Sequence, residues 1–309
     1  MRLKTFTLFS LVSAAAFTVA AGFDADAWLL KREVVSREAE RLASVFARQQ
    51  AAADSPAEGL VVPIESWPDG TVKTDLRADR AQFFPSEGLV WGAGVKIKQR
   101  RADQSAEAEV TATELLFERA TRCVWAEGAT KAVYGGDTVI EGEGVYLDFE
   151  EGYLRISSNT VVVANGDELR GRRADYDRDA GVVMLEGEVR LKHVDRGEVY
   201  NLGCDRAFVF LEGTNSLKRV VALGSVTLAG GTRNGSCDKA VYLKNGGRIT
   251  MYGRENPCEP ARLKDAGGKA GELQGSKITF WTESEQVEVL DSKLSVEAGA
   301  LNGGKGMKW

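Results

Sequence analysis

The sequence contains one histidine, four cysteines and six prolines in 309 residues, and its acidic residues outnumber its basic ones. With His193 as the only histidine, a Ser-His-Asp triad or a common zinc site with several histidine and cysteine ligands is hard to build. A net charge of −5 argues against nucleic-acid binding, which requires a basic surface. A hydrophobic fraction of 43% argues against intrinsic disorder. We therefore expect a folded protein that is not an enzyme and that needs neither a cofactor nor a metal ion.

The N-terminus begins with two positive charges in its first four residues, followed by an uncharged run of small and apolar residues from 5 to 21. This order is typical of a secretory signal, and Val19-Ala20-Ala21 fits the small-residue rule for cleavage. The sequence therefore predicts a signal peptide over residues 1–21 and an exported mature protein. The alternative is that residues 5–21 remain as a membrane anchor, because about 17 residues is at the short end of what spans a bilayer.

The stretch that follows predicts a helix, a linker and then a large domain. Residues 28–50 carry apolar side chains near helical spacing, with charges between them, and predict an amphipathic helix. We expect this helix to pack against one end of the next domain, where it could cover an edge strand. Residues 51–64 lose this periodicity and predict a linker. The glycine- and lysine-containing residues 299–309 predict a disordered tail, so residues 65–298 form the main domain.

The main domain is an array of internal repeats. A small or apolar residue, any residue and then an aromatic residue recur about every 33 residues, which predicts about seven copies of one structural unit. The copies are Ala81-Gln82-Phe83, Leu115-Leu116-Phe117, Gly144-Val145-Tyr146, Ala174-Asp175-Tyr176, Ala207-Phe208-Val209, Ala240-Val241-Tyr242 and Ile278-Thr279-Phe280, the fifth of which has valine in the aromatic position.

Each unit is predicted to be a β-hairpin. Short turns such as Arg178-Asp179-Ala180-Gly181 follow the aromatic residues, and turns of this length join antiparallel neighbours. A glycine interrupts the apolar strand after each of several turns, as at Gly94, Gly128, Gly187 and Gly253, while Ser157 and Asp291 take this position in two units. Glycine inside a strand marks a bend or a close backbone approach. A column of such bends would crease the sheet along one line.

A creased antiparallel sheet would fold over on itself and enclose an apolar slot, because a long twisted sheet must cover its apolar face. Alternation along the strands predicts which side chains face the slot. The predicted lining residues are Phe83, Trp91, Phe117, Trp125, Tyr146, Leu154, Tyr176, Leu185, Leu223, Tyr242, Met251 and Phe280. If the two inner faces touch, these residues form an ordinary packed core, and if the faces splay apart, they form a groove for apolar ligands.

The repeats resemble a known family. The segments RADYDRDAGVVMLEGEVRL (173–191) and CDRAFVFLEGTNSLKRVVALGSVTL (204–228) combine an alanine-aromatic strand, a short turn, an apolar strand and Gly-x-Val-x-Leu. This pattern is similar to the OstA-like repeat of the periplasmic lipopolysaccharide-transport proteins LptA and LptC and the N-terminal domain of LptD. The segment ESWPDGTVKTDLRADRAQFF (65–84) resembles the start of an LptC unit. The resemblance covers roughly residues 60–298.

The resemblance implies an all-β fold: an elongated antiparallel β-jellyroll, folded over like a taco, built from about seven hairpin repeats and preceded by one short helix. It implies that lipopolysaccharide or a related glycolipid is carried in the periplasm, with lipid A acyl chains in the slot, toward the outer membrane. It also implies that other Lpt-type jellyroll proteins pair with it edge to edge. The family offers no catalytic residues to carry over. An LptA-like and an LptC-like role both stay open.

Two other functions are compatible with exported β repeats. An envelope scaffold could assemble through its sheet edges without binding lipid. A secreted parallel β-solenoid could bind or degrade polysaccharide, although the short hairpin turns argue against parallel coils.

The four cysteines predict one disulfide, since export would permit disulfides. Cys204 and Cys237 occupy equivalent positions in adjacent units and so lie two strands apart, which is too far for a bridge. Cys237 and Cys258 lie on opposite arms of one hairpin, and we predict that these two pair. Four reduced, buried cysteines are the alternative.

Overall fold

The structure, a computed structural model, describes most of the chain in two compact units. The described residues are 25–52, 56–134, 138–164, 166–195, 198–212, 216–255, 259–265, 271–282, 284, 286–291 and 293–296. Unit 1 holds the described residues up to 134, with 142–156 and 177–180, and unit 2 holds 138–141, 157–176 and the residues from 181 on. The predicted signal peptide and the predicted tail lie outside the described residues.

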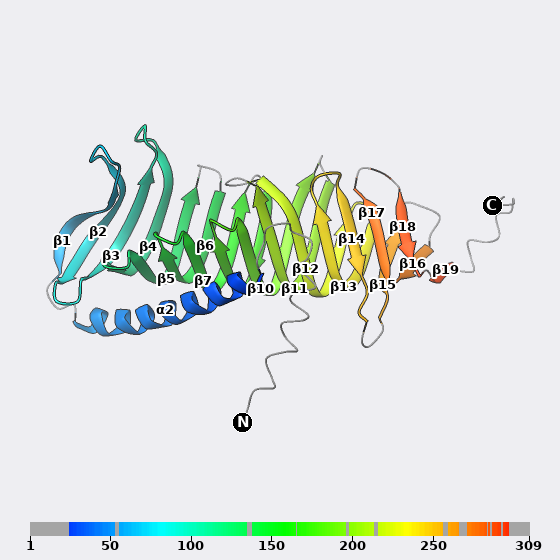
Figure 1. Ribbon diagram of the computed structural model, residues 1–309, viewed down its shortest axis with the longest axis horizontal. Helices are drawn as coiled ribbons and strands as arrows, with labels where there is room; N and C mark the ends of the chain where they lie inside the picture. The colour runs from blue at the N-terminus through cyan, green and yellow to red at the C-terminus, as the bar shows by residue number, and fades with distance from the viewer. Residues whose placement is uncertain are drawn as a thin grey trace, which may run out of the picture. The chain divides into compact units, whose positions relative to one another are not determined.

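The fold is all-β and antiparallel, with one N-terminal helix (Figure 1). Unit 1 contains α2 (Ala25–Ala52), β1 (Ala57–Ser66), β2 (Val72–Phe84), β3 (Leu89–Arg100), β4 (Ala106–Glu118) and β5 (Cys123–Tyr134). Unit 2 contains β8 (Asp167–Gly171), β10 (Val182–Asp195), β11 (Glu198–Glu212), β12 (Ser216–Gly230), β13 (Arg233–Leu243), β14 (Arg248–Tyr252), β15 (Ala261–Asp265), β16 (Gly271–Gly275), β17 (Lys277–Trp281), β18 (Val287–Leu290) and β19 (Lys293–Val296). Residues of β6 (Thr138–Asp148), β7 (Tyr153–Ala164) and β9 (Arg173–Asp177) belong to both units.

The helix and the first strand differ from the sequence prediction in their bounds. Helix α2 is longer than the predicted 28–50, and β1 occupies most of the segment that was predicted to be a linker. The alternation of Leu60 and Val62 with more exposed neighbours is a weak strand pattern, and it becomes a strand because β2 supplies a pairing partner through the register Leu60↔Ala78 and Val62↔Leu76.

The predicted crease is confirmed at Gly94, Gly128 and Gly187, whereas Gly253 has no positive φ angle and is instead closely approached by the backbone of residues 259–261. Gly94, Gly128, Gly187 and Gly224 all have positive φ angles of 62° to 78°. The ladders between β10 and β11 and between β12 and β13 both shift register where these glycines interrupt them. A bulge of this kind bends a strand and increases its local twist. Each long strand therefore contributes one segment to each of two arms, which meet at the crease.

In unit 2 the two arms are defined by strand pairing. Arm A consists of residues 182–186 of β10, 206–212 of β11, 216–223 of β12 and 239–243 of β13, with β14, β17 and β18. Arm B consists of β8, residues 189–195 of β10, 198–204 of β11, 226–230 of β12 and 233–237 of β13, with β15, β16 and β19. Buried side chains of both arms form one apolar cluster, so the arms face each other.

In unit 1 the folded-over sheet has a core between its arms and a second core beneath the helix. A Cβ at Gly92 would lie 3.1 Å from Cβ of Ala78 and 3.0 Å from Cγ2 of Val95, which lie beyond the crease, so the inner faces touch. On the outer face, α2 contacts β3, β4 and β5 (Figure 1). Leu42 and Phe46 of the helix are almost fully buried there.

The helix therefore lies on a sheet face rather than over the edge strand β1, where the sequence analysis had allowed it. The physical reason is the apolar outer face of β3 to β5, which carries Trp91 and Trp125 and matches the buried stripe of the helix. Burying such large side chains stabilises the helix far more than covering a strand edge would.

Candidate functional site

A row of leucines runs across the inner face of arm B in unit 2. Pairing places Leu191 opposite Leu169 on one side and Leu202 on the other, and continues through Leu228. The row then passes Gly235 to Leu263 and Leu273. Residues that pair directly across an antiparallel ladder point to the same face, so these side chains form one apolar stripe perpendicular to the strands.

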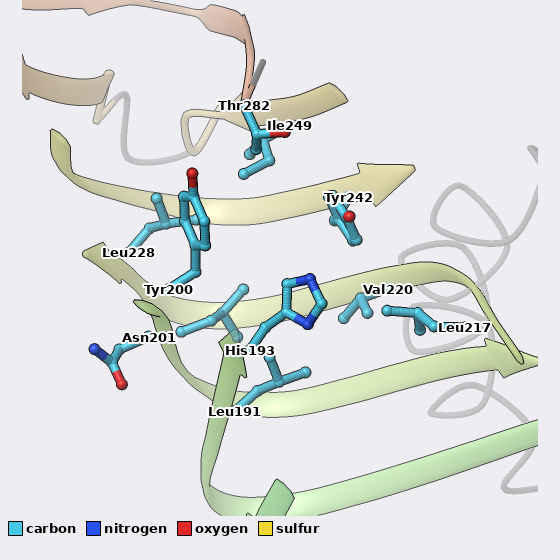
Figure 2. A pocket seen from close by; sticks show the side chains of 11 residues that line it. Leu191, His193, Tyr200, Asn201, Leu217, Val220, Leu228, Tyr242, Ile249 and Thr282 are labelled. Carbon is cyan, nitrogen blue, oxygen red and sulfur yellow. The ribbon is translucent and has the colours of Figure 1, made fainter. Parts of the chain in front are cut away.

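Part of this row lines an open groove between the two arms (Figure 2). Arm B contributes Leu191, Leu202 and Leu228 to the groove, and arm A contributes Val220 and Ile249. The remaining lining residues are His193, Tyr200, Asn201, Leu217, Tyr242 and Thr282. The walls are thus mainly aliphatic and aromatic, with a few polar groups, which is the usual composition of a site for an apolar ligand.

The groove is shallow because the inner faces meet near the crease. Its cavity volume is about 50 Å³, a few times the roughly 10–15 Å³ needed to hold one water. Deeper in the slot, a Cβ at Gly235 would lie 2.7 Å from Cε of Met251 on the opposite arm, so Met251 fills the gap in the leucine row. The structure therefore combines both arrangements considered from the sequence: a packed core near the crease and an open groove farther out.

His193 is the main polar side chain in the groove wall. Its Nδ1 lies 2.8 Å from Oδ1 of Asp167, which also accepts the backbone N–H of Val194 at 3.2 Å. The imidazole ring lies 6.2 Å from the ring of Tyr242 on the opposite arm (Figure 2). The contact with Asp167 fixes the orientation of the ring and directs its second nitrogen away from that carboxylate.

In unit 2 the predicted lining residues divide between the two faces. Tyr242, Met251 and Phe280 come together in the inner cluster, and Tyr242 also lines the groove. Leu185 lies on the inner face, where a Cβ at Gly171 of arm B would approach its Cβ to 3.3 Å. Leu223 instead pairs in a row with Arg206 and Lys239 on the outer face, one residue out of phase with the inward Ala222. Tyr176 is half-buried on β9.

In unit 1 the predicted lining residues also divide. Trp91, Trp125 and Tyr146 lie in the cluster beneath α2, on the outer face. Phe117 points to the opposite, inner face, as does Phe83, which pairs with the same Val90 and remains 44% exposed. Leu154 follows Tyr153, which belongs to the cluster beneath the helix, and so it takes the inner face. Lipid contact by any of these residues stays a prediction.

The predicted disulfide is not formed, because Cys237 carries a free thiol. Cys237 pairs with Val226 on one side, and on its other side the β13–β15 register ends one residue before it, at Ser236↔Arg262. Cys258 itself lies outside the described residues. The Cys237 thiol donates to the carbonyl of Lys239 at 3.2 Å, and burial raises its pKa to about 12. Burial likewise raises the pKa of Cys204 to about 12.

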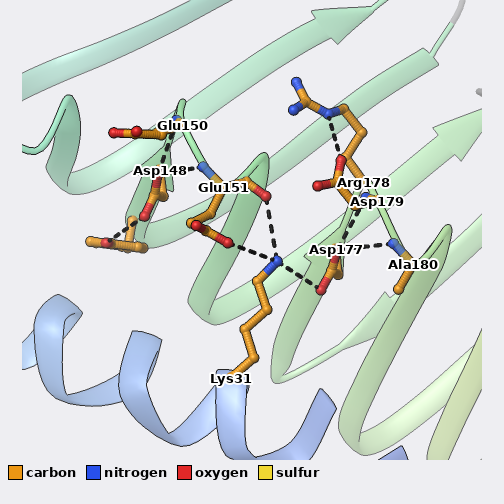
Figure 3. A network of polar contacts seen from close by, with 9 residues as sticks. Lys31, Asp148, Glu150, Glu151, Asp177, Arg178, Asp179 and Ala180 are labelled. Carbon is orange, nitrogen blue, oxygen red and sulfur yellow. Dashed lines mark hydrogen bonds and ion pairs between the residues drawn. The ribbon is translucent and has the colours of Figure 1, made fainter. Parts of the chain in front are cut away.

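A separate polar network in unit 1 attaches the start of α2 to two turns (Figure 3). Lys31 Nζ lies 3.2 Å from Oδ2 of Asp177 and 3.3 Å from Oε2 of Glu151. Asp148 and Asp177 each accept two backbone N–H groups of their own turns, those of Glu150 and Glu151 and those of Asp179 and Ala180. Burial opposes the charge of Lys31, but the two carboxylates outweigh it and raise its pKa.

Farther along α2, Arg41 attaches the helix to the end of β4. Its guanidinium makes two hydrogen bonds to the carboxylate of Glu118, at 3.1 and 2.7 Å. Burial of Glu118 favours its neutral form, but the bonds from Arg41 and Thr121 outweigh this effect and hold its pKa below the usual value. These contacts position the helix and lie on the outer face, away from the slot of unit 1.

Sequence reasoning missed the arm B side of the groove. The predicted lining residues include only the aromatic positions and the strand segments directly after the turns, and so they omit Leu191, Leu202, Leu228 and Tyr200. A usable signal existed: Leu191 and Leu228 are the leucines of the two Gly-x-Val-x-Leu motifs. Since the glycine marks the crease, the leucine four residues later lies on the second arm and faces inward.

Comparisons with known proteins show a likeness to solved structures. No family model and no curated protein matches the chain. Among solved structures, the chain is similar to LptH, described as the LptA homologous periplasmic component of the conserved lipopolysaccharide transport device from Pseudomonas aeruginosa, with a TM-score of 0.35 and 13% sequence identity. The match covers 42% of this chain and 94% of that one.

Two further observations concern the described residues. In that part of the chain, no helix combines the length and the hydropathy needed to cross a membrane. The same residues contain no group of three or more histidine, cysteine, aspartate or glutamate side chains placed to hold a metal ion.

Proposed function

We propose that the protein is an exported, periplasmic lipid-binding protein that takes part in the transport of lipopolysaccharide or a related glycolipid toward the outer membrane. The slot of unit 2 would hold acyl chains, and the protein would act by binding, without catalysis or a cofactor. The resemblance of its repeats to the LptA and LptC family supports the choice of ligand.

The observation that carries this proposal is the apolar groove between the arms of unit 2. Soluble proteins normally bury such a surface, yet Leu191, Leu202 and Tyr242 remain half-buried along it. Transferring an acyl chain from water into such a groove gains about 0.8 kcal/mol per buried methylene. Several methylenes suffice for appreciable affinity, so a groove of this composition favours an acyl ligand over a sugar or a peptide.

Photo-crosslinking in cells tests the proposal at one inward position. With a photoreactive phenylalanine analogue in place of Tyr242, irradiation is expected to give an adduct that is detected by antibody against lipopolysaccharide. The reason is that the Tyr242 ring forms part of the groove wall. The analogue keeps the aromatic ring, so the inner cluster should tolerate it.

Tyr252 provides the matched control, because it is a tyrosine of the same arm on the outer face, between Lys239 and Lys277. The same analogue there is expected to give no adduct. Adducts of equal yield at both positions, or none at Tyr242 in a folded and exported protein, would contradict a lipid-carrying slot and favour the scaffold.

The edge of unit 1 supports a second element of this proposal, pairing with other jellyroll proteins. In the described chain, β1 has one pairing partner, β2, so its other side presents unpaired backbone groups. Pro63 lacks an N–H group and is tolerated at such an edge. An added strand would satisfy the remaining groups, in the way that extended segments augment exposed sheet edges.

The edge is tested with a photoreactive residue in place of Val61, which is 56% exposed on β1. In the purified protein, the yield of crosslinked dimer is expected to rise with protein concentration, measured by denaturing electrophoresis. Val34, which is 59% exposed on α2, is the control position and is expected to give little dimer. Crosslinking that is equal at the two positions, or a dimer yield independent of concentration, would contradict pairing through β1.

A further inference from the structure

The groove of unit 2 is lined by β10 to β12 on arm B and by β12 to β14 on arm A, and it ends beside Thr282, where Arg233 joins the two arms. Arg233 follows the turn at Gly231 and lies at the tip of arm B. Its Nη1 donates to the carbonyl oxygen of Trp281 at 3.1 Å, and its Nη2 donates to that of Ser284 at 3.3 Å. Both carbonyls belong to the end of β17 and the turn that follows it, at the tip of arm A.

The same guanidinium covers the inner cluster. It lies 5.3 Å from the centre of the Phe280 ring, which faces inward from β17. A cation over an aromatic face is attracted to it, and the effect increases when water is excluded. Arg233 thus links the tip of arm B to the tip of arm A and closes the slot above Phe280.

The apolar surface continues beneath this closure. Leu228, Ile249 and Tyr242 belong both to the open groove and to the inner cluster. From them the cluster extends to Leu263 and Phe280, on the side of the slot that Arg233 covers. The groove is therefore the open end of a longer apolar path, and the covered end is filled by the protein's own side chains.

We propose that Arg233 determines the length of acyl chain that the slot of unit 2 accepts. This inference rests on the proposed function, since it concerns the same slot. A short chain occupies the open groove beside His193 and Tyr200 without disturbing the arms. A longer chain has to pass between Leu263 and Phe280, which requires the arms to part and the two bonds from Arg233 to break.

This assignment has a measurable signature in a series of saturated fatty acids. Each additional buried methylene should raise affinity about fourfold, because transfer of a methylene from water is worth about 0.8 kcal/mol. The rise should level off at the chain length that fills the open groove. When the arms are free to part, the rise should continue to longer chains.

The experiment measures displacement of a fluorescent fatty acid from the purified protein by fatty acids of increasing length. Arg233→Leu places an apolar side chain over Phe280 and removes both hydrogen bonds. Its affinity is expected to level off at a longer chain than that of the wild type, while the affinities for the shortest chains stay equal. Arg248→Leu is the control, because Arg248 is exposed on the outer face of arm A, the arm that accepts the bonds from Arg233, and it should behave like the wild type.

A covalent bridge tests the closure itself. In the variant with Arg233→Cys and Ser284→Cys, joining the two thiols with a short bismaleimide is expected to restore the wild-type limit, and leaving them unjoined should give the longer limit. Equal limits in the wild type and Arg233→Leu, with both proteins folded by circular dichroism, would overturn the role of Arg233 and leave acyl binding intact. If no fatty acid displaces the probe from the wild type or from any variant, the proposed function fails, and this inference fails with it.

Discussion

Replacing Gly94 by alanine is expected to lower the free energy of unfolding by about 2–4 kcal/mol, against about 1–2 kcal/mol for Gly128→Ala. Both glycines lie at the crease of unit 1 with φ angles of 62° and 72°, which cost alanine the same conformational strain. The two positions differ in the space that is available for a methyl group. A Cβ at Gly94 would collide with Oδ2 of Asp79 and lie 3.1 Å from its Cβ, whereas a Cβ at Gly128 would meet no atom within 4 Å.

Urea denaturation followed by tryptophan fluorescence measures both variants. The contribution of the collision is isolated by adding Asp79→Ala to Gly94→Ala, since this removes the carboxylate that the new methyl group would meet. The double variant should recover most of the difference from Gly128→Ala, since only the contact with the Cβ of residue 79 remains. If Gly94→Ala and Gly128→Ala are destabilised equally, the close approach of Asp79 to the crease contributes nothing, and left-handed geometry alone accounts for the glycines.

Leu42→Ala in α2 is expected to lower the stability of unit 1 by about 2–5 kcal/mol, the usual cost of removing a fully buried leucine side chain. Leu42 is 0% exposed and packs in the cluster that contains Trp91 and Trp125. The cavity would lie between the helix and the sheet, so the helix should also pack less firmly. Thermal denaturation gives the loss of stability, and near-ultraviolet circular dichroism reports the tryptophan environment.

Leu30 supplies the control on the same helix, because its side chain is 65% exposed. Leu30→Ala removes the same atoms and should change stability by no more than about 0.5 kcal/mol. A small effect at both positions would mean that the helix contributes little to unit 1, and that Lys31 and Arg41 alone keep it in place.

The crease is the part of the fold that the sequence predicted best, for a physical reason. A left-handed or closely approached backbone favours glycine, so the bends can be recognised in the sequence by their glycines. The prediction is also correct at Asp291, which has a φ angle of 54°, but it is less accurate in two other units. Gly253 has no positive φ angle. In the third unit the left-handed residue is Asn159, with a φ angle of 55°, rather than Ser157, and asparagine tolerates this conformation better than most side chains.

The assignment of faces was less predictable, because both faces of several strands are buried. Leu115-Leu116-Phe117 and Leu89-Val90-Trp91 are continuous apolar runs, with one face toward the slot and the other toward α2. Strands buried on both faces lose the polar alternation that indicates direction. The prediction therefore places large aromatic residues in the slot, and it is wrong for Trp91, which packs against α2 on the outer face. The position of a helix on a sheet face depends on contacts distant in sequence, which the local pattern does not contain.

The leucine row of unit 2 makes the capacity of the slot modular. Every hairpin adds two strands to arm B, each of which brings one position to the row, as Leu191 and Leu202 do on β10 and β11. Strands lie about 4.8 Å apart, so inserting or deleting one hairpin would change the length of the path by about 10 Å and leave its cross-section unchanged. Duplication of a single repeat can thus adapt such a protein to a longer ligand in one genetic step, without redesign of any side chain already in place.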